Sequence, residues 1–344
     1  MIVDENGTVL FSRAALEPRA NASTTKIVTA LVVRDRAELD EVVTVSETAA
    51  ATGGGGLDLS SRDRYEVESL LYALLMTSSN EAAVALAEHV AGSEPRFVAL
   101  MNRTAAALGA RATHFVTAHG LDMPSHYSCA RDLALFGLEL LRDPVLAEIV
   151  DTTTTTIPGP AGRVVLENRN VLLEGYKGAS GIKTGYTALA GDVLVASARR
   201  GSRAVVAVTM GATSDEVAAV EATALLDRGW MLLARTVIFP ADRALATLVY
   251  DPSGATEVVA GEPIRGPWPL EDIAISFEPA AGITPPLAAG DEVGRVTVRH
   301  DGRIVAEAPA LARDPIPAAD GTTWGETLLT GLLRALGSLA EEIA

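Results

Sequence analysis

The chain has 344 residues, 48% of them hydrophobic, and a formal net charge of −16. A chain of this length can bury a large core and is expected to form two domains. The acidic balance and the lack of a basic tract argue against nucleic acid as a partner, because its phosphates would be repelled. The five histidines lack metal-ligand spacing and Cys129 is a lone cysteine, so we expect no metal, no cofactor and no internal disulfide.

The first predicted element is a β-hairpin over residues 2–11 that turns at Asn6 and Gly7. The fold therefore begins at once, and the sequence leaves no room for a signal peptide ahead of it. We expect the numbering to start inside a longer precursor, or the chain to have been trimmed.

Lysine is rare in this chain. Of its 28 lysine and arginine residues, only three are lysines: Lys26, Lys177 and Lys183. A desolvated lysine amine can lose its proton and act as a base, whereas arginine stays protonated in proteins. Two of the three lysines lie in short polar strings, and these strings therefore indicate a catalytic or binding role.

The first string, Ser23-Thr24-Thr25-Lys26, precedes the apolar run at residues 27–33 and predicts a helix that begins near Ser23. A spacing of three residues places both side chains on one helix face, within reach of each other. Ser23 is then a candidate nucleophile and Lys26 its base. Taken alone, the string fits a capping serine and a solvated lysine better.

The second string, Ser78-Ser79-Asn80, lies between a predicted helix at residues 67–76 and an alanine-rich helical run at residues 81–89. Serine hydroxyls and asparagine amides can pass protons and hydrogen-bond a substrate amide. The same residue types also cap ordinary helices, and by itself this string favours that simpler role.

The third string runs from Gly181 to Tyr186 and leads into apolar stretches at residues 193–198 and 204–210. The pattern predicts strands, with an antiparallel hairpin. Lys183 and Thr184 on a strand edge can hold an anionic group, and Gly185 lets a backbone approach closely. Only the three strings together, in this order, form a specific signal of function.

Residues 1–235 resemble the serine D-alanyl-D-alanine carboxypeptidases, the penicillin-binding proteins of low molecular mass. Four further segments carry the likeness: residues 69–76, 97–102, 113–121 and 126–133. The resemblance implies the penicillin-recognising serine enzyme fold, an α/β (α+β) arrangement of an antiparallel sheet with helices plus a helical subdomain. It also implies removal of the terminal D-alanine from peptidoglycan stem peptides, outside the cytoplasmic membrane, and covalent inhibition by β-lactam antibiotics.

The resemblance also implies catalytic roles. Ser23 would attack the carbonyl between two D-alanines, Lys26 would take its proton, and Ser78 and Asn80 would relay protons and align the peptide.

Substrate binding would fall to the third string. Lys183 and Thr184 would hold the substrate carboxylate beside Gly185, and the backbone N–H groups of Ser23 and Tyr186 would form the oxyanion hole.

Some positions depart from the family pattern. Asn21 stands where proline is common, Glu81 where aspartate is frequent, and Cys129 where threonine is frequent. None of these changes removes a catalytic group. Ala218 and Ala219 occupy the place where some relatives carry an arginine that helps to bind the terminal carboxylate.

Three rival functions are weighed. A class A β-lactamase shares the three strings, but the Glu-x-x-Asn string from Glu167 to Asn170 lies too close to Lys183 for the β-lactamase loop and instead resembles the Asn-x-Asn-x-Leu-Leu segment of the carboxypeptidases. A catalytically silent peptidoglycan-binding module and a structural envelope protein are the other two. The intact serine and lysine strings speak against both.

We expect three parts in the chain: a serine transpeptidase-like catalytic domain at residues 1–236, a β-rich accessory domain at 237–320, and an amphipathic helix at 321–344. Within the accessory domain, residues 295–306 predict a hairpin that turns at Asp301 and Gly302. The carboxy-terminal helix is open to two roles, peripheral contact with a membrane surface or packing on its own domain or on a second subunit.

Overall fold

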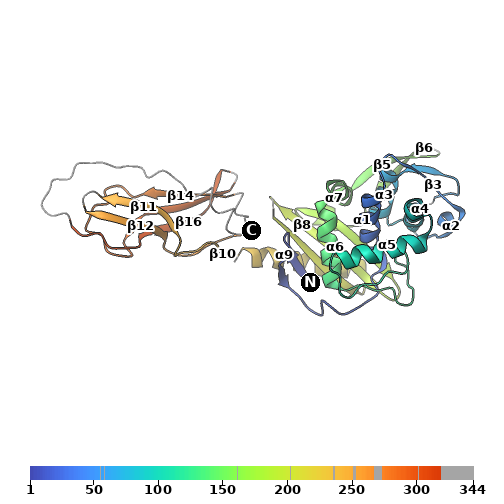
Figure 1. Ribbon diagram of the computed structural model, residues 1–344, viewed down its shortest axis with the longest axis horizontal. Helices are drawn as coiled ribbons and strands as arrows, with labels where there is room; N and C mark the ends of the chain where they lie inside the picture. Colours follow the sequence, from blue (N-terminus) through green and yellow to red (C-terminus); the bar gives the residue numbers. More distant parts are fainter. Residues whose placement is uncertain are drawn as a thin grey trace. The chain divides into compact units, whose positions relative to one another are not determined.

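A computed structural model describes residues 1–54, 56–57, 59–160, 162–201, 203–234, 237–250, 253–266, 273–300 and 302–318 (Figure 1). The chain divides into two compact units, Met1–Leu232 and Leu233–Ala344, close to the boundary predicted after residue 236. The amphipathic helix predicted over residues 321–344 lies outside the described residues.

Unit 1 is built on a five-stranded antiparallel sheet with the strand order β2-β1-β9-β8-β7. Its strands are β1 (Ile2–Asp4), β2 (Val9–Phe11), β7 (Ala179–Thr187), β8 (Gly191–Arg200) and β9 (Arg203–Ala212). The amino-terminal hairpin is confirmed, with Gly7 at φ +82° in its turn. The strands predicted from the third string are also confirmed, and β7 lies at the edge of the sheet.

Helices cover both faces of this sheet (Figure 1). Gly137 of α6 (Ala130–Arg142) lies against Val206, and a Cβ atom built on it would be 3.7 Å from that side chain. A Cβ atom built on Gly229 of α9 (Asp215–Leu233) would lie 2.6 Å from the side chain of Val205, the residue just before Val206. Consecutive strand residues point to opposite faces, so α6 and α9 pack on opposite sides of the sheet.

The remaining elements of unit 1 form its helical part. They are α1 (Lys26–Arg36), β3 (Val42–Thr44), α2 (Glu47–Ala51), β4 (Arg64–Glu66), α3 (Val67–Leu75), α4 (Asn80–Ala91), α5 (Glu94–Ala107), α7 (Pro144–Asp151), β5 (Thr154–Gly159), β6 (Gly162–Glu167) and α8 (Leu172–Gly175). Most residues of α1 between Lys26 and Val33 are buried, and its charged carboxy-terminal residues, Arg34–Arg36, are half-buried or exposed. Its first residue, Lys26, is therefore placed inside the core.

Unit 2 is rich in β-structure. A five-stranded antiparallel sheet has the order β11-β12-β16-β15-β14, and a separate pair joins β10 to β13. The strands are β10 (Val237–Phe239), β11 (Ala244–Tyr250), β12 (Gly254–Ala260), β13 (Ile264–Arg265), β14 (Ile273–Pro279), β15 (Glu292–His300) and β16 (Arg303–Ala312). His300 pairs with Arg303, which confirms the hairpin predicted over residues 295–306. The α+β fold with a second β-rich domain is thus confirmed.

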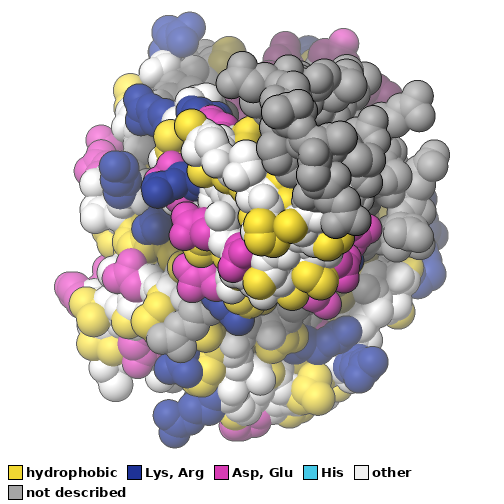
Figure 2. Space-filling view, turned by 90° about the vertical axis from the view of Figure 1, so that its left-hand side faces the viewer, with side chains coloured by type: hydrophobic (Ala, Val, Ile, Leu, Met, Phe, Trp, Pro, Cys, Tyr) yellow, Lys and Arg dark blue, Asp and Glu magenta, His cyan; other side chains and the backbone are white. Residues whose placement is uncertain are grey.

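The surface is mixed in chemical character. On the face drawn in Figure 2, acidic and basic side chains lie among hydrophobic ones rather than in one field of a single sign. Among the described residues, no helix combines the length and the apolar character needed to cross a membrane.

Candidate active site

Ser23 lies in a short 3-10 turn, Ala22–Thr25, that leads directly into α1. The sequence predicted a helix that begins near Ser23, and the chain does turn helical there, but no side chain caps the helix. Asn21 donates its amide to Thr25 Oγ1 at 2.9 Å instead. The Ser23 hydroxyl is consequently left free for another partner.

That partner is Lys26, which is fully buried. Its Nζ lies 2.8 Å from Ser23 Oγ, 2.7 Å from Asn80 Oδ1 and 2.8 Å from the carbonyl oxygen of His119. A neutral amine has two N–H donors and one lone pair. The two oxygens that can only accept, from Asn80 and His119, match the two donors and leave the lone pair for the Ser23 hydroxyl.

Burial holds the pKa of the Lys26 amine well below its usual value, and the cations Lys183 and Arg169 lower the pKa further. Glu81 acts in the opposite direction as the smallest contribution. An amine with a lowered pKa can be neutral near physiological pH, as a general base must be.

The second string lies at the junction of α3 and α4. Asn80 is the first residue of α4, and its Nδ2 donates to the carbonyl oxygens of Gly53 at 2.9 Å and Gly54 at 2.6 Å. Ser79 is the cap, since its Oγ accepts from the N–H of Ala82 at 3.0 Å. Ser78 is not used for capping. It is a non-glycine residue with φ +65°, a sparsely populated conformation that displays its side chain on the cavity.

The third string forms the edge of the sheet on β7. A Cβ atom on Gly185 would lie 2.9 Å from the Ser23 nitrogen, so only glycine lets the strand approach the nucleophile turn this closely. Lys183 is 1% exposed, and its Nζ donates to the carbonyl oxygen of Thr184 at 2.9 Å. Burial and the nearby Arg169 lower the pKa of Lys183 to about 7.

These groups surround one cavity of about 300 Å³. Six of the eight residues predicted from sequence line it: Ser23, Ser78, Asn80, Thr184, Gly185 and Tyr186. Lys26 and Lys183 are not on its surface, because both are buried in its walls. The fold thus brings the three strings together from an α-helix, a helix junction and a sheet edge.

The sequence interpretation missed several groups. Arg169 lines the cavity, two residues after Glu167, and its charge acts on both buried lysines. The available signal was its position in the Asn-x-Asn-x-Leu-Leu segment, which was assigned only as a family likeness. Ala218 and Ala219 do line the cavity, and they present no charge there.

His119 contributes a backbone carbonyl, so its residue type gave no clue to this contact. Its Nδ1 accepts from the N–H of Leu121 at 3.2 Å. Burial, with the nearby Lys26, lowers the pKa of His119 to about 4. The imidazole is therefore neutral near pH 7.

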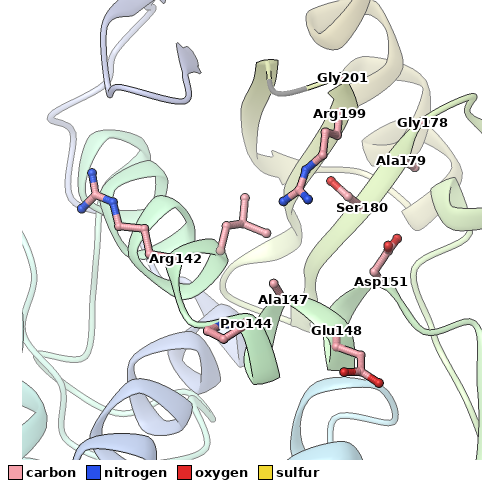
Figure 3. A pocket seen from close by; sticks show the side chains of 11 residues that line it. Arg142, Pro144, Ala147, Glu148, Asp151, Gly178, Ala179, Ser180, Arg199 and Gly201 are labelled. Atoms are coloured by element: carbon pink, nitrogen blue, oxygen red, sulfur yellow. The ribbon is translucent and has the colours of Figure 1, made fainter. Parts of the chain in front are cut away.

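A second cavity, of about 730 Å³, lies between α7 and the start of β7 (Figure 3). Arg142, Arg199, Glu148 and Asp151 line it, together with the hydroxyl of Ser180. That hydroxyl is 3.0 Å from Ser197 Oγ and has no lysine or histidine beside it in the lining. The larger cavity thus lacks the nucleophile and base that the smaller one holds.

Comparison with known proteins points to one family. Residues 1–214 match the peptidase S11 family model, described as D-alanyl-D-alanine carboxypeptidase. D-alanyl-D-alanine carboxypeptidase DacC of Escherichia coli is 33% identical, over 93% of this chain and 84% of the relative. D-alanyl-D-alanine carboxypeptidase DacF of Bacillus subtilis is 29% identical, over 94% of this chain and 86% of the relative.

Solved structures give the same result. Penicillin-binding protein 5 from Haemophilus influenzae has a TM-score of 0.63 and 28% identity, and the match covers 92% of this chain and 96% of that one. The DD-transpeptidase of Streptomyces K15 has a TM-score of 0.64 and 30% identity, covering 67% of this chain and 95% of that one.

Proposed function

Because the chain belongs to the D-alanyl-D-alanine carboxypeptidase family, we propose that it removes the terminal D-alanine from peptidoglycan stem peptides through an acyl-enzyme on Ser23. The observation that carries this assignment is the buried Lys26 amine, 2.8 Å from the Ser23 hydroxyl. The lowered pKa of this amine fits the role of general base.

Acylation begins with attack of Ser23 Oγ on the carbonyl between the two D-alanines. The hydroxyl proton passes to the Lys26 amine, whose other two N–H bonds stay with Asn80 and His119. When the tetrahedral intermediate collapses, the C–N bond breaks and the leaving D-alanine nitrogen takes up a proton. Ser78, on the cavity surface beside Asn80, is the hydroxyl that passes this proton.

The anionic end of the substrate belongs at β7. The Lys183 ammonium and the Thr184 hydroxyl hold the terminal carboxylate, and the N–H groups of Ser23 and Tyr186 stabilise the oxyanion. The close approach of Gly185 to the Ser23 nitrogen supports this arrangement, because it sets the edge strand beside the nucleophile turn. Water then hydrolyses the ester and releases Ser23.

A class A β-lactamase activity is less well supported. That reaction needs a separate glutamate to activate the deacylating water. Glu167 does not line the cavity, and the carboxylates that line it in the described part of the chain, Asp192 and Asp215, belong to β8 and α9 instead of the segment before β7. The catalytically silent binding module is disfavoured by the intact contact between Ser23 and Lys26.

We propose that residues 1–236 form the catalytic domain and residues 237–320 the accessory β domain. For residues 321–344, the amphipathic sequence supports the proposal of a helix in peripheral contact with a membrane surface. The substrate places the protein outside the cytoplasm, in the cell envelope. β-Lactam antibiotics are covalent inhibitors at Ser23, and nucleic acid is not a partner of a chain with net charge −16.

The decisive experiment is covalent labelling with a fluorescent penicillin, followed by mass mapping of the labelled peptide. Label on Ser23 is expected. In parallel, a peptide that ends in D-Ala-D-Ala should release D-alanine, and its L-Ala-terminated analogue should be inert. Equal turnover of both stereoisomers, or no turnover by fully folded protein, contradicts the carboxypeptidase assignment.

A further inference from the structure

The loop formed by residues 117–122, here called the brace loop, touches both the base and the nucleophile turn. Its His119 carbonyl accepts a hydrogen bond from Lys26 Nζ at 2.8 Å. Its Gly120 has φ +89°, and a Cβ atom there would lie 2.0 Å from the carbonyl oxygen of Ala22. The position of the brace loop therefore affects where the base sits relative to the nucleophile.

The inner end of the brace loop is fixed to helices. The carbonyl oxygen of Ala118 accepts a hydrogen bond from Thr29 Oγ1 of α1 at 2.6 Å. The N–H of Ala118 donates to Glu94 Oε1 of α5 at 2.8 Å. These contacts are buried or partly buried, so this end of the loop is anchored to α1 and α5.

Asp122 holds the outer end of the brace loop. Its carboxylate accepts from Thr187 Oγ1 at 2.6 Å and from the N–H of Leu189 at 3.2 Å. Thr187 is the last residue of β7, and its hydroxyl also accepts from the N–H of Ala190 at 3.1 Å. Asp122 thus ties the brace loop to the turn between β7 and β8 through charge-assisted hydrogen bonds.

This tie joins two walls of the catalytic cavity. Leu121, next to Asp122, lines the cavity from the brace loop, and Tyr186, next to Thr187, lines it from β7. Strand β7 is at the edge of its sheet, so strand pairing holds it on one side only. The Asp122 carboxylate restrains the other side at the end of the strand.

We propose that Asp122 is a positioning residue for acylation. By holding the brace loop against the end of β7, it keeps the His119 carbonyl on the Lys26 amine while β7 stays beside the nucleophile turn. This inference rests on the proposed function, since it assigns Asp122 to the acylation of Ser23. A misplacement of about 1 Å in such a constellation can cost about 100-fold in rate.

The test compares acylation by a penicillin in D122N, T187V and the double variant, with the melting temperature of each measured. D122N keeps the size of the side chain but removes its charge, and T187V keeps the shape but removes the hydroxyl. We expect the first-order acylation constant to fall about tenfold in each single variant, while the dissociation constant of the preceding noncovalent complex changes less than about twofold. The double variant should be no slower than the slower single variant, because both substitutions act on the same hydrogen bond between Asp122 and Thr187.

Two controls separate an effect on the positioning of the base from a general loss of stability. T187S keeps the hydroxyl and should restore acylation. D63N removes a carboxylate that accepts from the Ser60 N–H in a turn away from the cavity lining, and it should leave acylation unchanged.

Wild-type acylation constants in folded D122N and T187V overturn the proposal, as does a double variant whose losses add. If D122N fails to fold, the comparison of T187V with T187S tests the proposal in its place. Wild-type protein that takes up no penicillin contradicts the proposed function itself, a result distinct from normal acylation by the variants.

Discussion

Lys26 and Lys183 are both buried in the walls of one cavity, yet their surroundings suit opposite proposed tasks. Lys26 faces a hydroxyl and two oxygens that can only accept, an arrangement that suits a neutral amine. Lys183 donates to the Thr184 carbonyl, and its proposed ligand is an anion, which suits an ammonium. The two roles can be separated by charge-conserving substitution, because arginine keeps the positive charge and loses the basic amine.

Lys26→Arg is expected to lower the acylation of Ser23 by about 100 to 10,000-fold, the usual range for loss of a general base. The rate of penicillin acylation measures this effect, with folding checked by thermal melting. Lys177→Arg is the matched control, since Lys177 is exposed and does not line the cavity. Near-normal acylation by folded Lys26→Arg protein would remove Lys26 as the base.

Lys183 predicts a pH dependence. Its pKa is lowered to about 7 in the free protein, so its ammonium is present below about pH 7 and is lost as the pH rises above that value. Because kcat/KM reports the ionisation of free enzyme, kcat/KM for a D-Ala-D-Ala peptide should decline on the alkaline side of about pH 7.

In Lys183→Arg the guanidinium stays charged, so this alkaline decline should vanish, although the overall rate is lower because arginine holds the carboxylate imperfectly. Lys177→Arg should keep the decline. An identical alkaline limb in wild type and Lys183→Arg would show that another group titrates.

At the scale of elements, the site depends on how closely β7 approaches the nucleophile turn. In Gly185→Ala the new Cβ atom would lie 2.9 Å from the Ser23 nitrogen and 3.1 Å from the Thr24 nitrogen, so the strand must move away. Since the Ser23 N–H is a proposed oxyanion donor, we expect acylation to fall about 100 to 1,000-fold. Stopped-flow acylation measures the loss.

Gly175→Ala is the control for this prediction, because nothing lies within 4 Å of a Cβ atom built on Gly175 in α8. It should acylate normally. Full activity of Gly185→Ala would mean that the strand tolerates a wider separation than the proposed oxyanion hole allows.

Sequence alone could predict the elements that carry the strings, because each has a local signature. The apolar run after Lys26 predicted α1, and the apolar stretches after Lys183 predicted β8 and β9. It could not predict the 3-10 turn at Ser23, which depends on the left-handed conformation of Ala22 at φ +47°. Nor could it predict that Ser79, and not Ser78, caps α4, since both are serines at the same junction.

The contacts between distant segments could not be predicted from the sequence for a different reason. Lys26 meets a backbone carbonyl at His119, and every residue type has such a carbonyl. The tie from Asp122 to Thr187 joins two segments 65 residues apart and has no motif of its own. Such contacts follow from tertiary packing, so only the folded chain reveals them.

At the scale of the whole molecule, catalysis is assigned to unit 1. The described residues that line the cavity lie between Ser23 and Ala219, and among the described residues the hydrophobic cores of the two units have no member in common. Removal of residues 323–344 should therefore leave kcat/KM for a soluble D-Ala-D-Ala peptide within about twofold of the full chain.

The same truncation tests the proposed membrane contact. Sedimentation with anionic lipid vesicles should fall when residues 323–344 are removed. Unchanged vesicle binding rules out this helix as the anchor, and loss of soluble-substrate activity shows that it packs on the protein instead.

The charges around the catalytic cavity have a thermodynamic consequence. None of the hydrogen bonds that the described residues make with Lys183 goes to a carboxylate, and Arg169 adds a second cationic group nearby. Lys183 thus lies near another cation and has no carboxylate among its hydrogen-bond partners in the described part of the chain. In the proposed mode of binding, the terminal carboxylate of the peptide, or that of a penicillin, supplies the missing half of an ion pair. Binding and folding are therefore coupled, and an occupied cavity makes the native state harder to unfold than an empty one.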